Sequence, residues 1–380
     1  MRDDMRLHAG LIGQQGSRAH LNTPALVIDR DALEHNIAAM AAFAREKGIG
    51  LRPHAKTHKS YEIARLQIEA GAIGICCAKL GEAEAIAELG RIDSILITSP
   101  VVTDQAITRL IALHPALSEL RVVVDHALNV AALEKAAVGL SRPLGVLIDI
   151  DPGIRRTGVT SAEAALDLAT VIKSSPHLRF DGVQFYCGVH QHIASFEDRR
   201  AGIVERTQYL KDITDKLSAA GAAPGIITGG GTGTHCIDAE LGVFTDLQVG
   251  SYVFMDRQYL ECDLTGSGLS PYRTALFIDA HVVSANTPGM ATIDAGFKAL
   301  STDGGAPSIV AGAPENSVYH FMGDEHGAVV SRGEKFLPGA SVTLGAPHCD
   351  PTVNLYDSYH VVRGNTLIDI WSVTARGRSR

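Results

Sequence analysis

The sequence predicts an α/β fold, a (β/α)8 TIM-type barrel followed by a smaller β-rich domain. Short apolar runs alternate with stretches of helical periodicity between Thr23 and Gly250, which is typical of a parallel sheet. Eight such strand–helix units in roughly 200 residues suit a closed barrel. After Thr274 the pattern changes to short β-like runs between Gly, Pro and Asn/Asp turns. An open doubly wound sheet is the alternative, but its early GxGxxG fingerprint is absent.

Each expected barrel strand is a short run rich in apolar side chains. After a first strand at residues 25–29, these runs cover residues 50–54, 73–77, 94–98, 121–125, 144–150, 180–186, 225–228 and 246–249. Helices are expected where apolar residues recur at helical spacing, at residues 31–47, 61–70, 82–89, 162–173 and 195–219. The β-like runs of the second domain lie at residues 275–284, 291–294, 318–322, 341–344 and 367–373.

The domain boundaries follow from the same change in pattern. We place the barrel at residues 23–265 and the β-rich domain at residues 1–22 plus 266–380. Gly266, Gly268 and Pro271 give the stretch between them the composition of a linker.

Composition excludes several classes of protein. The net charge is −8 and no basic stripe is present, which argues against a nucleic-acid partner. The six cysteines show no CxxC spacing, so neither a disulfide scaffold nor a zinc ribbon is expected. The first residues lack the apolar core of a signal peptide, and no apolar run has the length of a membrane helix. We therefore expect a cytoplasmic protein without a membrane partner.

The segment RPHAKTHK at residues 52–59 follows the first barrel strand. In a barrel, the C-terminal ends of the strands are where catalytic residues collect. A lysine in a partly buried, cation-rich setting can lose its proton and attack an aldehyde. His54, His58 and Lys59 would supply the positive potential. A basic loop that only contacts solvent is the alternative.

Two glycine-containing loops follow the seventh and eighth barrel strands. Residues 228–234 read TGGGTGT, and Gly250, Ser251 and Tyr252 stand at the matching place after the next strand. Successive backbone N–H groups in such loops form anion-binding nests, and barrels often bind phosphate at these two positions. A glycine run is also a common turn, but two consecutive loops of this kind predict a phosphate site.

His348 and Asp350 form a candidate metal site in the second domain. Residues two apart on an extended segment point to the same side, so an imidazole and a carboxylate could chelate one divalent ion. Mixed nitrogen and oxygen ligation suits Mn²⁺, Mg²⁺, Co²⁺ or Zn²⁺, with water in the open positions. An ordinary loop is the alternative.

Two further segments at strand ends carry polar side chains. His190 and His192 follow the sixth strand and are candidates for a general base; a structural pair is the alternative. Arg155 and Arg156 follow the fifth strand, where a buried arginine could hold a phenolate or a carboxylate. Surface arginines are the alternative there.

Together these motifs resemble one family, from residue 23 to residue 376. The segments TPALVID (23–29), RPHAKTHK (52–59), GICC (74–77), GGGTGT (229–234), GSYVFMD (250–256), DEHG (324–327) and PHCDPTVNLYD (347–357) are similar to the D-threonine aldolase and D-serine dehydratase group. That group belongs to the alanine-racemase-like (fold type III) enzymes, which use pyridoxal 5′-phosphate (PLP).

The resemblance assigns roles to individual residues. It implies that Lys56, the lysine after His-Ala, carries PLP as a Schiff base, with His54 beside it. It implies phosphate contacts at Thr232, Gly233, Gly250 and Ser251, with Tyr252 next to them. It places Arg156 and Tyr186 around the cofactor ring. It also implies a homodimer with the site near the interface.

The metal motif selects the branch of the family. D-serine dehydratases of this group have His-x-Cys, whereas His348-x-Asp350 is like the aldolases of D-threonine and D-3-hydroxyaspartate. The carboxylate favours Mn²⁺ or Mg²⁺. The implied function is a carbon–carbon lyase that cleaves a β-hydroxy-D-amino acid to glycine and an aldehyde. His192, His190 or a metal-bound hydroxide would be the base.

Other activities remain as alternatives. A D-3-hydroxyaspartate aldolase would release glyoxylate with glycine, and a D-serine-type dehydratase would release ammonia and an α-keto acid. A racemase would need bases on both faces of the ring and no metal. A non-catalytic PLP carrier is a barrel alone, which the second domain argues against.

Overall fold

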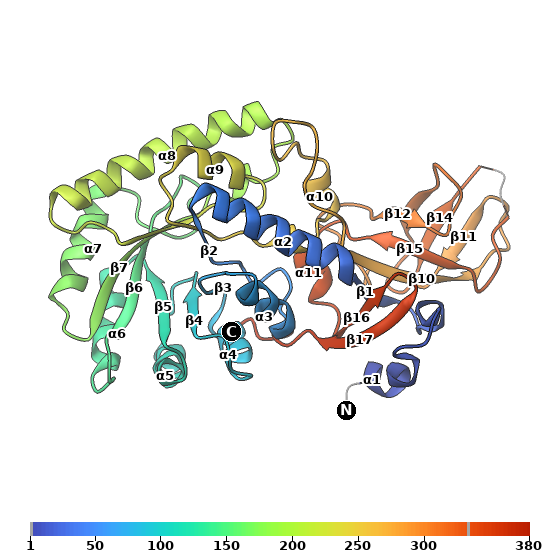
Figure 1. Cartoon of the computed structure of the whole chain (residues 1–380), viewed down its shortest axis with the longest axis horizontal. Coiled ribbons are helices and arrows are strands. Elements are labelled where there is room, and N and C mark those ends of the chain that lie inside the picture. Colours follow the sequence, from blue (N-terminus) through green and yellow to red (C-terminus); the bar gives the residue numbers. More distant parts are fainter. Residues whose placement is uncertain (1–2, 333–334) are drawn as a thin grey trace.

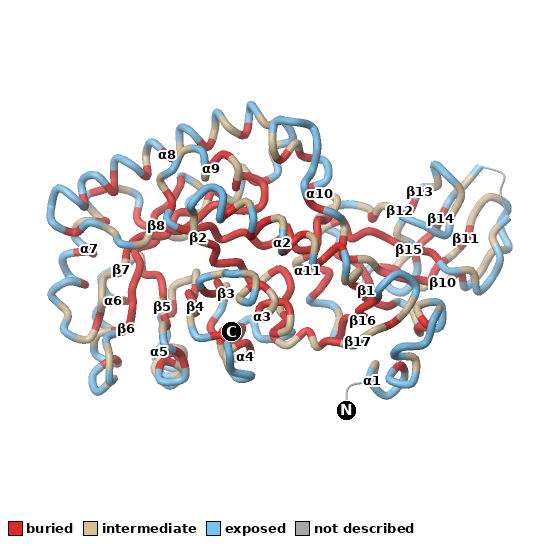
Figure 2. The backbone as a smooth tube through the Cα atoms, viewed as in Figure 1, coloured by how far each residue is buried: buried red, intermediate tan, exposed pale blue. Residues whose placement is uncertain are grey.

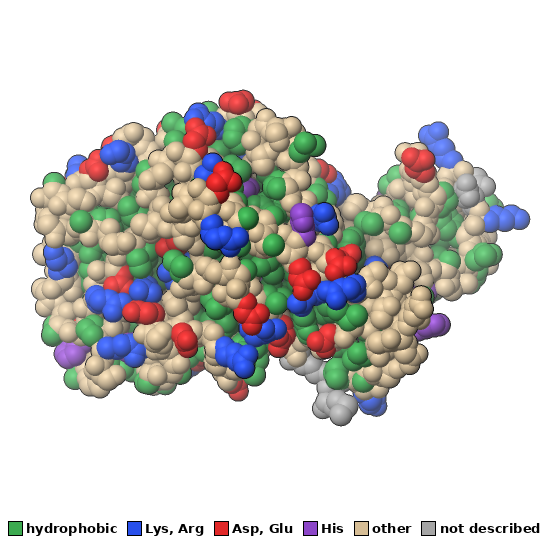
Figure 3. Space-filling model, in the orientation of Figure 1, with side chains coloured by type: hydrophobic (Ala, Val, Ile, Leu, Met, Phe, Trp, Pro, Cys, Tyr) green, Lys and Arg blue, Asp and Glu red, His purple; other side chains and the backbone are tan. Residues whose placement is uncertain are grey.

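The computed structural model describes residues 3–332 and 335–380. Figure 1 shows two lobes, a barrel with helices around it and a β-rich lobe at one end. No described helix has the length and apolar character needed to cross a membrane. On the face shown in Figure 3, acidic and basic side chains are interspersed, without a basic stripe.

Eight parallel strands form the barrel in the cyclic order β2-β9-β8-β7-β6-β5-β4-β3. They are β2 (Gly50–Leu51), β3 (Ile75–Cys77), β4 (Ser94–Ile97), β5 (Glu119–Val124), β6 (Leu144–Asp149), β7 (Leu178–Phe185), β8 (Ile226–Gly229) and β9 (Asp246–Leu247). The sheet curls round on itself, because Ile73 N–H donates to Leu51 O at 2.8 Å and His54 forms a parallel bridge with Cys76. The predicted barrel class is confirmed.

Helices alternate with the strands and cover the outside of the barrel (Figure 1). They are α2 (Arg30–Lys47), α3 (Tyr61–Glu69), α4 (Leu80–Ala87), α5 (Asp104–Leu113), α6 (Ala127–Ala137), α7 (Ala162–Ser174), α8 (Phe196–Ala219) and α9 (His235–Leu241). Several of them have a first turn capped by the side chain of the preceding residue, for example Asp29 for α2, Thr103 for α5 and Ser161 for α7. The left-handed Gly48 ends α2.

The second domain is a mixed sheet of nine described strands, ordered β13-β14-β11-β10-β1-β16-β17, with β15 pairing β10 and β12. These are β1 (Ala25–Asp29), β10 (Leu276–Ser284), β11 (Met290–Ile293), β12 (Ser308–Ala311), β13 (Val318–Phe321), β14 (Gly327–Val330), β15 (Ser341–Gly345), β16 (Ser358–Arg363) and β17 (Thr366–Ser372). Short helices complete the chain. They are α1 (Asp3–His8), α10 (Arg257–Leu260), α11 (Cys349–Val353), η1 (Ala9–Leu11), η2 (Ser17–His20), η3 (His114–Ala116), η4 (Gly188–His190) and η5 (Ser251–Val253).

The first strand differs from its expected place. We assigned residues 25–29 to the barrel domain, but β1 pairs antiparallel with β10 and parallel with β16 in the second sheet. Its neighbours are about 250 and 330 residues away. A local pattern reveals a strand but not such distant partners, so the sequence alone could not place it.

Both faces of β1 are buried, and Figure 2 shows this region in red. Leu26 and Ile28 point into the large core that continues into the barrel. Ala25 and Val27 point the other way, into a small cluster with Leu21. The strand therefore joins the core of the second sheet to that of the barrel.

We expect Leu26→Ala to lower the thermal unfolding midpoint clearly. Leu26 has no exposed surface, and truncating such a leucine leaves a cavity that costs about 2–5 kcal/mol. Leu128→Ala is the matched control, because Leu128 on α6 is 75% exposed and its truncation should change stability by less than about 0.5 kcal/mol. Equal midpoints for the two variants would contradict the packing described for β1.

Candidate active site

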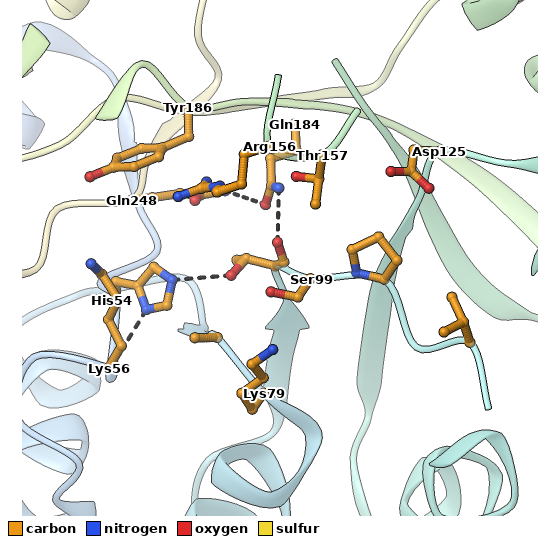
Figure 4. Close-up of a pocket in the computed structure, with 14 residues that line it drawn as sticks. His54, Lys56, Lys79, Ser99, Asp125, Arg156, Thr157, Gln184, Tyr186 and Gln248 are labelled. Carbon is orange, nitrogen blue, oxygen red and sulfur yellow. Dashed lines mark hydrogen bonds between the residues drawn. The ribbon is translucent and has the colours of Figure 1, made fainter. Parts of the chain in front are cut away.

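A cavity of about 540 Å³ opens at the C-terminal ends of the barrel strands. Figure 4 shows Lys56, His54, Arg156, Tyr186 and Gln248 around one part of it. Lys79, Ser99 and Asp125 line the opposite part. A cavity of this size with several polar groups is the usual form of a small-molecule site.

Lys56 lies in this cavity and contacts the second domain. Its Nζ is 3.1 Å from Asp350 Oδ2. The charge of Asp350 raises the pKa of Lys56 above its usual value, against the effect of burial. Burial acts to raise the pKa of Asp350, but the Lys56 and His348 charges outweigh it and lower that pKa to about 2. Lys56 is thus an ammonium group held by a carboxylate when no cofactor is attached.

The surroundings of Lys56 differ from those expected. Burial lowers the pKa of His54 well below its usual value and that of His58 to about 4, so both rings are neutral. Lys59 is neutralised by Glu82, 3.1 Å from its Nζ. The cation-rich setting predicted for this segment is therefore wrong, because burial removes two of the charges and an ion pair cancels the third.

His54 sets the geometry of the loop that carries Lys56. Its Nδ1 accepts the N–H of Lys56 at 3.3 Å, so the ring proton is on Nε2. That nitrogen lies 3.1 Å from the Thr98 hydroxyl, which in turn donates to Cys77 O. His54 thus ties the end of β2 to the ends of β3 and β4.

His348 and Asp350 lie at the beginning of α11, and their geometry differs from the extended segment we predicted. His348 has extended backbone and is the N-cap, whereas Asp350 is in the first helical turn. Cys349 between them is fully buried, and its N–H donates to Asp256 at 2.9 Å. Asp350 Oδ1 is buried without a hydrogen-bond partner.

The two candidate bases point in different directions. Burial lowers the pKa of His192, and the charges of His348 and Lys56 lower it further, so the ring is a neutral imidazole. Its ring packs on that of Tyr259, with centroids 4.5 Å apart. His190 instead contacts Gly202 on α8, where its charged neighbours are Arg206 and Glu205.

The glycine loop after β8 is held by side chains that we did not predict. Gly233 N–H donates to the side chain of Gln191 at 3.0 Å, and Gly231 N–H donates to Thr234. A Cβ on Gly233 would lie 2.0 Å from the carbonyl oxygen of Gln191, so only glycine fits. The N–H groups of Gly231 and Gly233 therefore fix the shape of the loop.

The two phosphate-type loops touch each other. Tyr252 N–H donates to the Thr232 hydroxyl at 3.0 Å. The Tyr252 hydroxyl is buried and accepts from Gln67, so its side chain points away from the cavity. Ser251 and Gly250 precede it, and a Cβ on Gly250 would lie 2.7 Å from Thr57 Oγ1. That hydroxyl is buried and has no partner, which is what an anion ligand would satisfy.

Arg156 and Tyr186 both line the cavity, and the guanidinium carbon lies 5.7 Å from the centre of the tyrosine ring. Neither Arg155 nor Arg156 is buried, contrary to the buried arginine we considered. Asp151 accepts the N–H of Arg155, whose φ is 55°, and this tight turn directs Arg156 toward the cavity. Gln248 completes this wall, donating to Gln184 and Thr228.

Comparison with known proteins decides the family. The family model described as alanine racemase, N-terminal domain, matches residues 28–258, and the putative serine dehydratase domain matches residues 275–362. The chain belongs to the alanine-racemase-like family. It is 38% identical over 364 residues to 3-hydroxy-D-aspartate aldolase of Paracoccus denitrificans, covering 95% of this chain and 93% of that protein.

Two other relatives agree with this assignment. D-threonine aldolase of an Arthrobacter species is 37% identical, covering 95% of this chain and 94% of that protein. The crystal structure of D-threonine aldolase from Filomicrobium marinum has a TM-score of 0.91 and 34% identity, covering 94% of this chain and 97% of that one. Within the alanine-racemase-like family the chain is therefore grouped with the aldolases of D-hydroxy amino acids.

The residues present fit the PLP of this family. Lys56 offers an amine in the cavity, Arg156 and Tyr186 lie beside it, and Thr57 Oγ1 is an unpartnered donor next to Gly250. PLP has an aldehyde, a ring and a phosphate, which match these three features.

A second group of potential metal ligands lies outside this site. Among the described residues, only Asp4, His8 and His360 bring three ligand atoms together. His8 Nε2 accepts the N–H of Asn22 at 2.9 Å, so its proton is on Nδ1 and is donated to His360 Nε2 at 2.8 Å. His360 Nδ1 in turn lies 3.3 Å from Leu26 O. The ring nitrogens of His8 and His360 therefore have hydrogen-bond partners without an ion, and the contact between the two rings links α1 to β16.

Reduction of the PLP-loaded protein with borohydride should place a pyridoxyl group on Lys56. Lys56 lines the part of the cavity beside Arg156 and Tyr186, whereas Lys79 lines the opposite part and Lys59 is held by Glu82. Fragmentation of the labelled peptide locates the adduct, and Lys56→Arg should lose the visible absorbance of bound PLP. An adduct on Lys59 would overturn the assignment.

Acid should destabilise the protein in part through His235, at the start of α9. Its Nδ1 lies 2.8 Å from Thr232 O, and its Nε2 accepts from Tyr272. Burial lowers its pKa from 6.5 to about 4, so its contribution is full above pH 6.5 and is lost as pH falls toward 4. The loss amounts to about 3 kcal/mol. The melting midpoint should fall less steeply with acid in His235→Gln; parallel pH profiles would exclude this role.

Proposed function

We propose that the chain is a PLP- and divalent-metal-dependent lyase that cleaves β-hydroxy-D-amino acids of the D-threonine type to glycine and an aldehyde. The observation that carries this proposal is the 3.1 Å contact between Lys56 Nζ and Asp350 Oδ2. In this contact the candidate cofactor lysine of the barrel forms an ion pair with the candidate metal ligand of the second domain. Aldolase relatives at 37–38% identity support the reaction class.

The side chains around Lys56 would position the cofactor and the substrate. PLP, when bound, supplies an electron sink for the pair released when the Cα–Cβ bond breaks. Arg156 and Tyr186 would hold the ring from one side, while Thr57, Thr232, Gly250 and Ser251 would surround the phosphate. Lys56 would hold the cofactor through its amine, and Asp350 would pair with Lys56 whenever that amine is free and protonated.

His348 and Asp350 would hold the metal. Asp350 Oδ1 is a buried oxygen without a partner, which a cation would satisfy. A divalent ion supplies a Lewis acid that lowers the pKa of the substrate hydroxyl. The carboxylate oxygen favours Mn²⁺ or Mg²⁺, with Co²⁺ and Zn²⁺ as further candidates.

His192 would take the proton of the substrate β-hydroxyl. Burial and the charges of His348 and Lys56 keep the pKa of His192 below its usual value, so the imidazole is free to accept a proton at neutral pH. The ring of Tyr259 holds it in place. His190 faces α8, and we therefore favour His192 as the base.

Two neighbouring activities have support of their own. A 3-hydroxyaspartate substrate would carry a second carboxylate, and both Arg156 and Lys79 line the cavity. A dehydratase activity is favoured by the match of residues 275–362 to the serine dehydratase model. The products, glyoxylate in one case and ammonia in the other, distinguish both from the D-threonine reaction.

We also propose that the protein works as a homodimer in the cytoplasm. The support is the family resemblance for the dimer and six free cysteines for a reducing compartment. Sedimentation of the PLP-loaded protein tests the first part.

Incubation with D-threonine, D-phenylserine or D-3-hydroxyaspartate should release glycine only when Mn²⁺ or Mg²⁺ is present. Removing the metal with a chelator, or the Asp350→Ala change, should reduce glycine release about 100-fold or more, since a Lewis acid contributes several kcal/mol to such a barrier. Amino-acid analysis measures glycine, and a keto-acid assay measures the dehydratase products.

The controls separate metal chemistry from folding. Re-addition of Mn²⁺ should restore the chelated wild-type protein but not Asp350→Ala, and both should retain the visible absorbance of PLP. Glycine release that is unaffected by metal removal would refute the role of His348 and Asp350.

A further inference from the structure

Asp303 lies in the loop before β12, and its carboxylate contacts Nδ1 of the candidate metal ligand His348. We infer that Asp303 is a positioning residue that orients the His348 ring for metal binding; this inference rests on the metal site of the proposed function. The Asp303 Oδ2 and His348 Nδ1 atoms are 2.6 Å apart.

The contact determines which ring nitrogen can bind a metal. A carboxylate accepts hydrogen bonds, so the ring proton must be on Nδ1, where Asp303 receives it. Nε2 then keeps its lone pair, which is the form of histidine that coordinates metals. A carboxylate behind a metal-binding histidine also increases the basicity of the ring and fixes its orientation.

Asp303 is separate from the ligand set itself. In the parts of the chain that the structure describes, no group of three ligand atoms combines Asp303 with His348 and Asp350. Its oxygen contacts Nδ1, which leaves Nε2 as the ring nitrogen available to a metal. Asp303 would therefore act through His348 and not on the metal.

The loop that carries Asp303 is fixed at one end to the segment around His348 and at the other end to α10, whose Arg257 N–H donates to Ala346 O at 3.2 Å. At one end, the Ser301 hydroxyl donates to His348 O, and Ser301 N–H donates to Thr352. At the other end, the Arg257 guanidinium donates to Ala306 O at 2.6 Å. These bonds hold residues 301–306 against the segment that leads into α11.

Gly304 permits the close approach of the loop. A Cβ at Gly304 would lie 2.8 Å from Pro347 O and 3.2 Å from the Cβ of His348. The absence of a side chain there lets the loop backbone lie against residues 347–348. Asp303, just before this glycine, is thus presented to the imidazole by backbone packing, although its own side chain is 56% exposed.

The test is the affinity of the PLP-loaded enzyme for Mn²⁺. Enzyme freed of metal by a chelator is titrated with Mn²⁺, and the free ion is measured by electron paramagnetic resonance. We expect Asp303→Ala to weaken binding about 10–100-fold, as removal of such partners does at other metal sites. Asp303→Asn keeps an acceptor oxygen but loses the charge, so its loss should be smaller. At saturating Mn²⁺, glycine release by both variants should approach the wild-type rate.

Glu134→Gln is the matched control, because Glu134 Oε1 contacts His177 Nδ1 at 2.7 Å in a similar pair away from the cavity. It should leave the Mn²⁺ affinity unchanged. Wild-type affinity in both Asp303 variants, together with lost affinity in His348→Ala, would overturn the role of Asp303 but keep the metal site. Unchanged affinity in His348→Ala would overturn the metal site, and the role of Asp303 with it.

Discussion

The contact between Lys56 and Asp350 is the point on which the functional arrangement depends. One residue follows the first strand of the barrel, and the other begins a short helix between the last strands of the second domain. Lys56 belongs to the barrel and Asp350 to the second domain, so neither domain alone forms this ion pair. The remaining features serve this contact: His54 holds the lysine loop, and Asp256 holds the turn before Asp350. The site is therefore a property of how the two domains pack.

Burial, more than net charge, sets the protonation states around this contact. The segment at residues 52–59 has three Lys or Arg side chains and two histidines, yet the folded protein neutralises most of the charge of this segment. His54 and His58 lose theirs through burial, and Glu82 pairs with Lys59. What remains is one ammonium group facing one carboxylate, a pairing that attachment of a cofactor to the lysine would break.

Much of the architecture could be predicted from the sequence, because barrel strands and helices are encoded locally. The helix over residues 30–47 and the strands at residues 94–97 and 144–149 lie within a few residues of their expected places. What could not be predicted depends on distant contacts. Nothing near Asp303 marks it as a partner of His348, since its sequence neighbours Gly304 and Gly305 look like an ordinary turn. Gln191 likewise lies between His190 and His192, whose type is typical of a catalytic base, although it is the Gln191 side chain that binds the glycine loop.

The position of β1 has a consequence for the order in which the protein can be completed during synthesis. This strand leaves the ribosome before the barrel strands, but its partners in the sheet are residues 276–279 and 360–362. The barrel strands, at residues 50–247, emerge in between and pair with one another. The second sheet therefore cannot be completed around β1 until residues 360–362 have been made. The strands that cover β1 are translated after the whole barrel, and the contact between Lys56 and Asp350 can form only once residue 350 has also been made.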